Sequence, residues 1–182
     1  WIYPVELTKP TFLNLYNAST WKGRLFQGLI KIAFHLGLRS SAASLSFTLY
    51  SRQPSRLDNL LQQIDHHQYS IFTGTVGVNR KCIVEVNSKG KTTHFIKIPL
   101  NTHSGFLIRN EKQMLEAMKN SGFKSMTTPR VIHVEEMDAE VVDNIKPEKV
   151  IHSTEFTALH AGALVELYMK NLTAEKIRSS EF

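Results

Sequence analysis

Cysteine is almost missing from this chain of 182 residues, since Cys82 is the only one. A single cysteine excludes a disulfide framework within the chain, so a reducing, cytoplasmic setting is expected. Cys82 lies in an apolar run, and we interpret it as a small core residue rather than a nucleophile. A long uncharged apolar run is missing as well, so no transmembrane helix is expected.

Acidic residues are scarce at the front of the chain. Residues 1–65 carry seven Lys or Arg against three Asp or Glu, which accounts for about +4 of the formal net charge of +6. A wide apolar stripe with helical spacing follows residue 20. Its only charges are positive: Lys22, Arg24, Lys31 and Arg39. Such a helix either lies on an anionic membrane surface or packs as a core helix of a larger protein, and the sequence leaves both readings open.

The hydrophobic pattern divides the chain at about residue 65. Residues 1–65 are predicted to form a mainly helical, basic leader, with a second short helix over Ser55–Ile64. Residues 66–182 have the pattern of a compact α+β unit. Hydrophobic residues make up 42% of the chain and charged residues 21%, which is typical of a globular protein with a core of its own.

The second part predicts seven elements in the order β-β-β-α-β-β-α. The strands are expected over Gln68–Phe72, Lys81–Val86, Thr93–Pro99, Pro129–Glu135 and Glu148–Ser153. A helix capped by Ser104 is expected to run from about residue 105 to 120, and a last helix over Thr157–Asn171. We therefore predict an α+β fold in which a five-stranded antiparallel sheet packs against one long helix.

Two charged residues lie where apolar side chains are expected. Lys97 is in the middle of the apolar strand THFIKIP, and its ammonium must stay solvated or find a partner. Glu111 falls in the centre of the predicted inward stripe of the next helix. This stripe consists of Leu107, Met114, Leu115 and Met118. Because a carboxylate there is costly unless a cation meets it, we predict an ion pair between Glu111 and Lys97. An exposed lysine on an edge strand is the alternative for Lys97.

The turn GTVGVNRK joins the first two predicted strands. Glycine lets the backbone approach a ligand and turn its N–H groups toward an anion, but a lone GxxG pattern usually marks only a hairpin. Here a strand lysine follows Gly77 after twenty residues, and a helix glutamate follows that lysine after fourteen. This succession resembles the N-terminal, ATP-binding lobe of protein-kinase-like proteins. Gly74, Gly77 and Asn79 in this turn are most similar to the phosphate hairpin of the aminoglycoside-phosphotransferase and small-molecule kinase branch, which often has the pattern Gly-x-x-Asn-x.

The resemblance covers about residues 68–171 and implies an ATP site. Lys97 would hold the α- and β-phosphates, and Glu111 would orient Lys97. Residues 151–156 would follow the fifth strand as the hinge against which adenine stacks. The implied contacts to the nucleotide are Gly74, Thr75, Gly77 and Asn79 in the turn, Val84 above the adenine, Lys97 and Glu111, and Ser153 and Glu155 in the hinge. The implied function is the ATP-binding lobe of a small-molecule or sugar phosphotransferase that uses ATP and magnesium.

The groups that complete phosphoryl transfer are missing from the pattern. Transfer requires an Asp that orients the acceptor hydroxyl and Asp or Asn ligands for magnesium. The aspartates are Asp58, Asp65, Asp138 and Asp143, and none lies in a histidine–aspartate loop. We therefore expect the chain to bind nucleotide but to be inactive alone. It would be either the front piece of a longer kinase-like protein, completed by a second lobe or partner chain, or a domain that lost the reaction.

The basic composition supports one alternative, a non-catalytic α+β module that binds nucleic acid or an acidic surface. Nucleic acid is disfavoured because no RNA-recognition or helix-turn-helix pattern is present, and residues 66–182 carry only about +2. The basic leader also allows a second hypothesis. In it the protein is cytoplasmic and binds peripherally to an anionic membrane surface through the leader.

Overall fold

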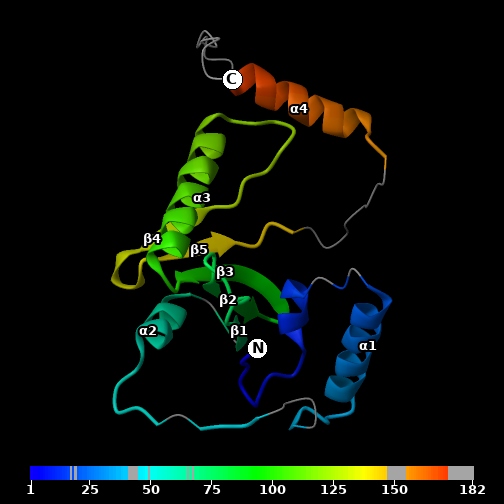
Figure 1. The fold of residues 1–182 in the computed structure, drawn as a ribbon, viewed down its shortest axis with the longest axis vertical. Coiled ribbons are helices and arrows are strands. Elements are labelled where there is room, and N and C mark those ends of the chain that lie inside the picture. Colours follow the sequence, from blue (N-terminus) through cyan, green and yellow to red (C-terminus); the bar gives the residue numbers. More distant parts are fainter. Residues whose placement is uncertain are drawn as a thin grey trace.

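The fold is α+β, with a five-stranded antiparallel sheet and one long helix after the third strand, as predicted (Figure 1). The computed structural model describes residues 1–16, 18, 20–40, 45–48, 50–64, 66, 68–146 and 155–171. The strands lie in the order β1-β2-β3-β5-β4. Their bounds are Gln68–Phe72 for β1, Lys81–Ser88 for β2, Lys91–Pro99 for β3, Val131–Val134 for β4 and Ala139–Asp143 for β5.

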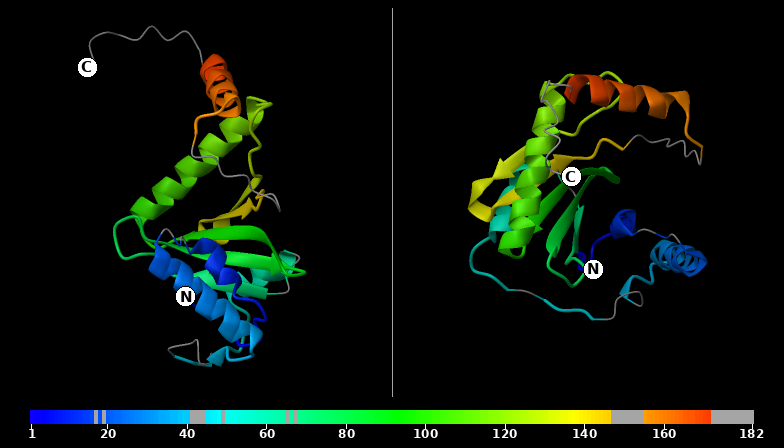
Figure 2. Two further views of the ribbon diagram at one scale, coloured as in Figure 1. Left: turned by 90° about the vertical axis from the view of Figure 1, so that its right-hand side faces the viewer. Right: turned by 45° about the horizontal axis from the view of Figure 1, so that its top comes forward.

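The helices in the described residues lie outside the sheet. The α-helices are α1 (Trp21–His35), α2 (Arg56–Gln63), α3 (Thr102–Asn120) and α4 (Ala158–Asn171), and two short 3-10 helices cover Thr11–Leu15 (η1) and Glu135–Met137 (η3). In Figure 1 and in the left view of Figure 2, α4 lies at the top of the molecule and α1 in its lower half, and α3 extends from the sheet toward α4.

The long helix α3 begins three residues earlier than predicted. Asn101, not Ser104, is its N-cap, and the Asn101 side chain accepts a hydrogen bond from the Ser104 amide at 2.8 Å. Ser104 completes a capping box, because its hydroxyl oxygen accepts from the Asn101 amide at 3.2 Å. The predicted cap was therefore wrong, since Asn101 offers an equally good capping side chain at the point where β3 ends.

The fifth strand differs most from the prediction. The predicted strand over Glu148–Ser153 lies outside the described residues. The structure instead forms β5 from Ala139–Asp143, a segment that the sequence analysis did not assign to any element. A tight connection through η3 and Asp138, whose φ is 47°, folds β5 back along β4. The residues that directly follow the fifth strand are therefore 144–146, rather than the predicted hinge at 151–156.

The two faces of the sheet have different chemistry. Directly opposite residues on neighbouring strands point to the same face, and one row across the sheet contains Ile83, Lys97, Glu140 and His133. This row lies on the side of α3, because Lys97 contacts that helix. The next row contains Val84, Ile96 and Val141 and faces α2.

The main core lies between α2 and this second face. Its buried members are Leu60, Leu61, Val84, Val86, Ile96, Ala139 and Val141. The helix α2 was assigned to the leader by sequence, but its two leucines share this core with the sheet. A second, smaller cluster of Leu7, Phe12, Leu13 and Phe34 holds α1 against the N-terminal segment. Residue 65 therefore does not separate two cores.

A buried carboxylate ties the N-terminal segment to the sheet. Glu85 on β2 is fully buried and accepts hydrogen bonds from the side chains of Asn14 (2.8 Å), Ser70 (3.2 Å), Asn87 (3.3 Å) and Thr92. A backbone bridge between Ile2 and Ile71 adds the first residues to the edge of β1. The leader is therefore attached to the sheet through both backbone and side-chain bonds.

Candidate functional site

The predicted ion pair between Lys97 on β3 and Glu111 on α3 is confirmed. The Lys97 side chain is only 16% exposed and that of Glu111 37%, so the pair is partly withdrawn from water. A second ammonium, Lys81 Nζ at the start of β2, lies 3.9 Å from Glu111 Oε2. One carboxylate therefore meets two lysines that come from neighbouring strands.

The predicted stripe around Glu111 was wrong at two positions. Leu107 and Met114 are exposed, by 37% and 66%, whereas the buried members of α3 are Ser104, Gly105 and Ile108. The inward face of α3 therefore includes Ile108 rather than Leu107, one residue later than predicted. Glu111 still lies at its border, three residues after Ile108, where it can reach the lysines on the sheet.

Glu140 is a third acidic component of this region, and the sequence analysis missed it because it missed β5. It stands directly opposite Lys97 in the register of β3 and β5 and is fully buried. Neither of its carboxylate oxygens has a hydrogen-bond partner among the described residues. Burial raises the pKa of Glu140 to about 7, and nearby Lys112 and Lys97 oppose this shift while Glu111 and Glu116 add to it.

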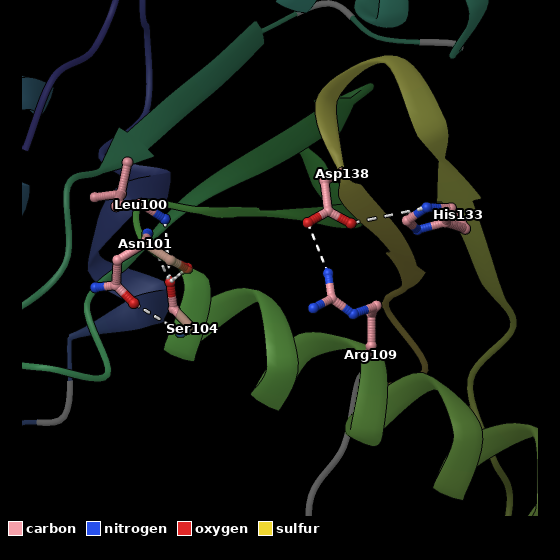
Figure 3. A network of polar contacts seen from close by, with 6 residues as sticks. All are labelled: Leu100, Asn101, Ser104, Arg109, His133 and Asp138. Carbon is pink, nitrogen blue, oxygen red and sulfur yellow. Dashed lines mark hydrogen bonds and ion pairs between the residues drawn. The ribbon is translucent and has the colours of Figure 1, made fainter.

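Polar contacts join α3 to the β4–β5 connection and to the end of β3 (Figure 3). Arg109 Nη1 on α3 lies 2.8 Å from Asp138 Oδ2, and His133 Nε2 on β4 lies 3.9 Å from the other carboxylate oxygen of Asp138. At the start of the helix, the hydroxyl oxygen of Ser104 also accepts from the Leu100 amide at 3.1 Å. Because α3 carries Glu111, these contacts also fix the position of the ion pair.

The glycine turn between β1 and β2 is held at its base and exposed at its tip. Gly74 has a φ of +78°, and a Cβ at this position would lie 2.3 Å from the carbonyl oxygen of Lys81. The Arg80 side chain donates to the Thr73 carbonyl at 3.0 Å, and the Asn101 side chain donates to the Val78 carbonyl at 3.1 Å. The second bond joins the turn to the first residue before α3. The turn, both lysines and Glu111 are therefore parts of one connected region.

The structure brings some of the predicted site residues together and separates others. Lys97 and Glu111 are paired, and Gly74, Thr75, Gly77 and Asn79 lie in the turn, with Thr75, Gly77 and Asn79 exposed. Val84 is fully buried against α2, on the face opposite to Lys97, and cannot line the same site. Ser153 lies outside the described residues, and Glu155 is exposed just before α4. Ile83, which stands opposite Lys97, is the apolar residue of β2 on the same face as Lys97.

No family model, curated protein or solved structure matches this chain. The region around Lys97 is therefore interpreted from its own chemistry. With Glu140 protonated, as its raised pKa favours below pH 7, two ammonium groups face one carboxylate and the cluster is cationic. Such a cluster, in the same region as an exposed glycine turn, can attract an anionic group.

Other features of the described residues do not add to this site. No group of three or more His, Cys, Asp or Glu in this part of the chain could hold a metal ion. Two surface hollows lie elsewhere, one between the end of α3 and β4 and the other between α2 and η3. Neither hollow includes Lys97 or Glu111.

Proposed function

We propose that this chain is the ATP-binding lobe of a kinase-like phosphotransferase that acts on a small molecule or sugar. One observation carries the proposal: the Lys97–Glu111 ion pair lies on the α3 side of the sheet, and the glycine-containing turn is bonded to the start of that helix through the Asn101 side chain. A lysine held by one carboxylate keeps further N–H donors for phosphate oxygens, and its position is fixed before the ligand arrives.

Each part of the site has a distinct role in the proposal. Lys97 contacts the phosphates, Glu111 positions Lys97, and Lys81 adds a second cation beside the same carboxylate. The amides of the turn around Gly74 and Gly77 cover the phosphates. Ile83 replaces Val84 as the apolar residue that faces the nucleotide, because it shares the row of Lys97.

In this function the chain binds the nucleotide, and a larger assembly carries out the chemical step. A second lobe or partner chain would supply the aspartate that orients the acceptor hydroxyl. Magnesium accompanies ATP in this class of reaction, but the described residues offer no set of ligands for it. We therefore assign no residue of this chain to the metal.

Lys97→Ala is expected to weaken ATP binding about tenfold, because the variant loses a charge-assisted hydrogen bond to phosphate. Isothermal titration calorimetry with ATP measures this change, and circular dichroism checks that the fold is kept. Lys119→Ala is the matched control: it removes the same charge from an exposed position near the end of α3, and ATP affinity should not change.

Equal ATP affinity in the wild type and in Lys97→Ala would contradict the assignment. A wild-type protein that ignores ATP and binds polyanions with a steep salt dependence would support the non-catalytic binding module instead.

A further inference from the structure

The helix α1 has an outward apolar stripe that the other described residues do not cover. Its members are Trp21, Leu25, Leu29, Ile32 and the C-cap residue Leu36, and each is more than half exposed. Their spacing of three or four residues places them along one side of the helix. Exposed apolar residues continue in the following segment with Leu45, Phe47 and Tyr50.

The other side of α1 is already packed. Phe34 is buried in the small cluster with Leu7, Phe12 and Leu13, and Ile30 packs against it. The Gln27 side chain donates to the Tyr16 carbonyl at 3.1 Å. The helix is thus fixed with a definite face outward, at the end of the molecule away from α4 (Figures 1 and 2). Its outward stripe therefore cannot turn inward without breaking these contacts.

The Lys and Arg side chains of α1 meet no acidic residue on the helix itself. The chain has no Asp or Glu between Glu6 and Asp58, although seven Lys or Arg lie in that interval. Lys22, Arg24 and Lys31 are exposed on α1, and Lys22 Nζ lies 5.8 Å from the centre of the Trp21 ring. A purely cationic rim around an apolar stripe complements a surface that is apolar inside and anionic at its border.

We propose that α1 binds to the surface of an anionic lipid bilayer. In this arrangement the stripe enters the boundary between headgroups and acyl chains, and the basic side chains contact anionic headgroups. Trp21 suits this boundary because its ring is apolar and its N–H can remain hydrated. None of the helices in the described residues is long and apolar enough to cross a bilayer, so α1 lies in the plane of the surface. This inference does not depend on nucleotide binding.

Sedimentation of the full chain with lipid vesicles, without ATP, tests the proposal. Wild type should bind vesicles of phosphatidylcholine and phosphatidylserine at least tenfold more tightly than vesicles of phosphatidylcholine alone. The double variant Leu25→Glu/Leu29→Glu should lose at least tenfold in affinity for the anionic vesicles, because two carboxylates then face the bilayer. Val165→Glu is the matched control, since Val165 is similarly exposed on α4 but lies at the other end of the molecule.

A charge variant separates lipid binding from simple apolar association. Lys22→Gln/Lys31→Gln should weaken binding to the anionic vesicles about tenfold and leave binding to neutral vesicles unchanged. Binding that does not distinguish the two vesicle types, or that survives Leu25→Glu/Leu29→Glu, would overturn the proposal. A wild-type dimer in analytical ultracentrifugation that becomes monomeric in the Leu25→Glu/Leu29→Glu variant would also overturn it, because the stripe would then be a contact between copies of the chain.

Discussion

Glu140→Gln is expected to raise the free energy of unfolding by about 2–3 kcal/mol at pH 8 and to change it little at pH 4. Glutamine keeps the shape of the side chain but has no charge. Urea unfolding at a series of pH values measures the difference between variant and wild type. The wild-type protein should therefore lose stability through Glu140 as the pH rises, and the variant should lack the part of the pH dependence that Glu140 contributes.

The sign of this effect follows from the environment of Glu140. The side chain is fully buried, its two oxygens lack partners among the described residues, and the ammonium opposite it is paired with Glu111. Its pKa is about 7 in the folded protein against 4.5 as the ordinary value. Between these values the folded state holds a proton that the unfolded state has released, so stability falls as the pH rises through this window. The loss is complete only about one pH unit above this folded pKa, where the carboxyl is ionised in both the folded and the unfolded state.

Glu85→Gln provides a control with the opposite sign. Glu85 is as buried as Glu140, but four side chains donate hydrogen bonds to its carboxylate. Burial raises the pKa of Glu85, and these hydrogen bonds oppose the shift. Replacing an acceptor oxygen by an NH₂ group should therefore destabilise the protein, by about 1–2 kcal/mol. If Glu140→Gln is also destabilising at pH 8, then Glu140 is charged and paired with a lysine in solution.

Local patterns were sufficient to predict the first three strands and the ion pair. The observed bounds of β1 match the prediction, and β2 and β3 are each extended by two residues at the end where they meet. Alternation over five to nine residues and the glycines of the turns carry this information within the segment itself. Lys97 and Glu111 were recognisable because each interrupts an apolar pattern, and buried opposite charges tend to meet.

The fifth strand could not be predicted in the same way. The segment AEVVD has only three apolar residues and a charge at each side of the Val pair. It becomes a strand because β3 and β4 bond to it from both sides, and such partners are distant in the sequence. Without β5, neither Glu140 nor its position opposite Lys97 could be expected.

The sequence also did not indicate whether Val84 or Ile83 lies on the same face of the sheet as Lys97. In KCIVEV, apolar residues occur at odd and even positions, so the sequence does not indicate which side chain shares the face of Lys97. The register decides it, since Ile83 stands opposite Lys97 and Val84 stands opposite Ile96. The predicted contact between Val84 and the nucleotide required Val84 to lie on the face of Lys97. The strand pairing places Val84 on the opposite face.

Gly74→Ala is expected to lower the free energy of unfolding by about 2–4 kcal/mol. The φ of +78° is strained for any residue with a Cβ, and the added methyl group would lie 2.3 Å from the Lys81 carbonyl oxygen. A backbone atom of a paired strand cannot rotate away as a side chain can, so the turn and the start of β2 must shift together. Urea unfolding measures the loss of stability. The same shift moves Lys81 relative to Glu111, so ATP titration of the folded variant should show weaker binding as well.

Two further Gly→Ala variants separate the clash from the backbone strain. Gly77 has a φ of +153°, and a Cβ added there would have no other atom within 4 Å. Gly77→Ala therefore introduces backbone strain without a steric clash. It should destabilise the protein less than Gly74→Ala does. Gly28 lies inside α1 with open space around it, and Gly28→Ala should stabilise the protein by up to about 1 kcal/mol through helix propensity. Equal losses for Gly74→Ala and Gly77→Ala would mean that the turn can move freely away from β2. A turn with that freedom would not hold its N–H groups in the fixed positions that the proposed phosphate contact requires.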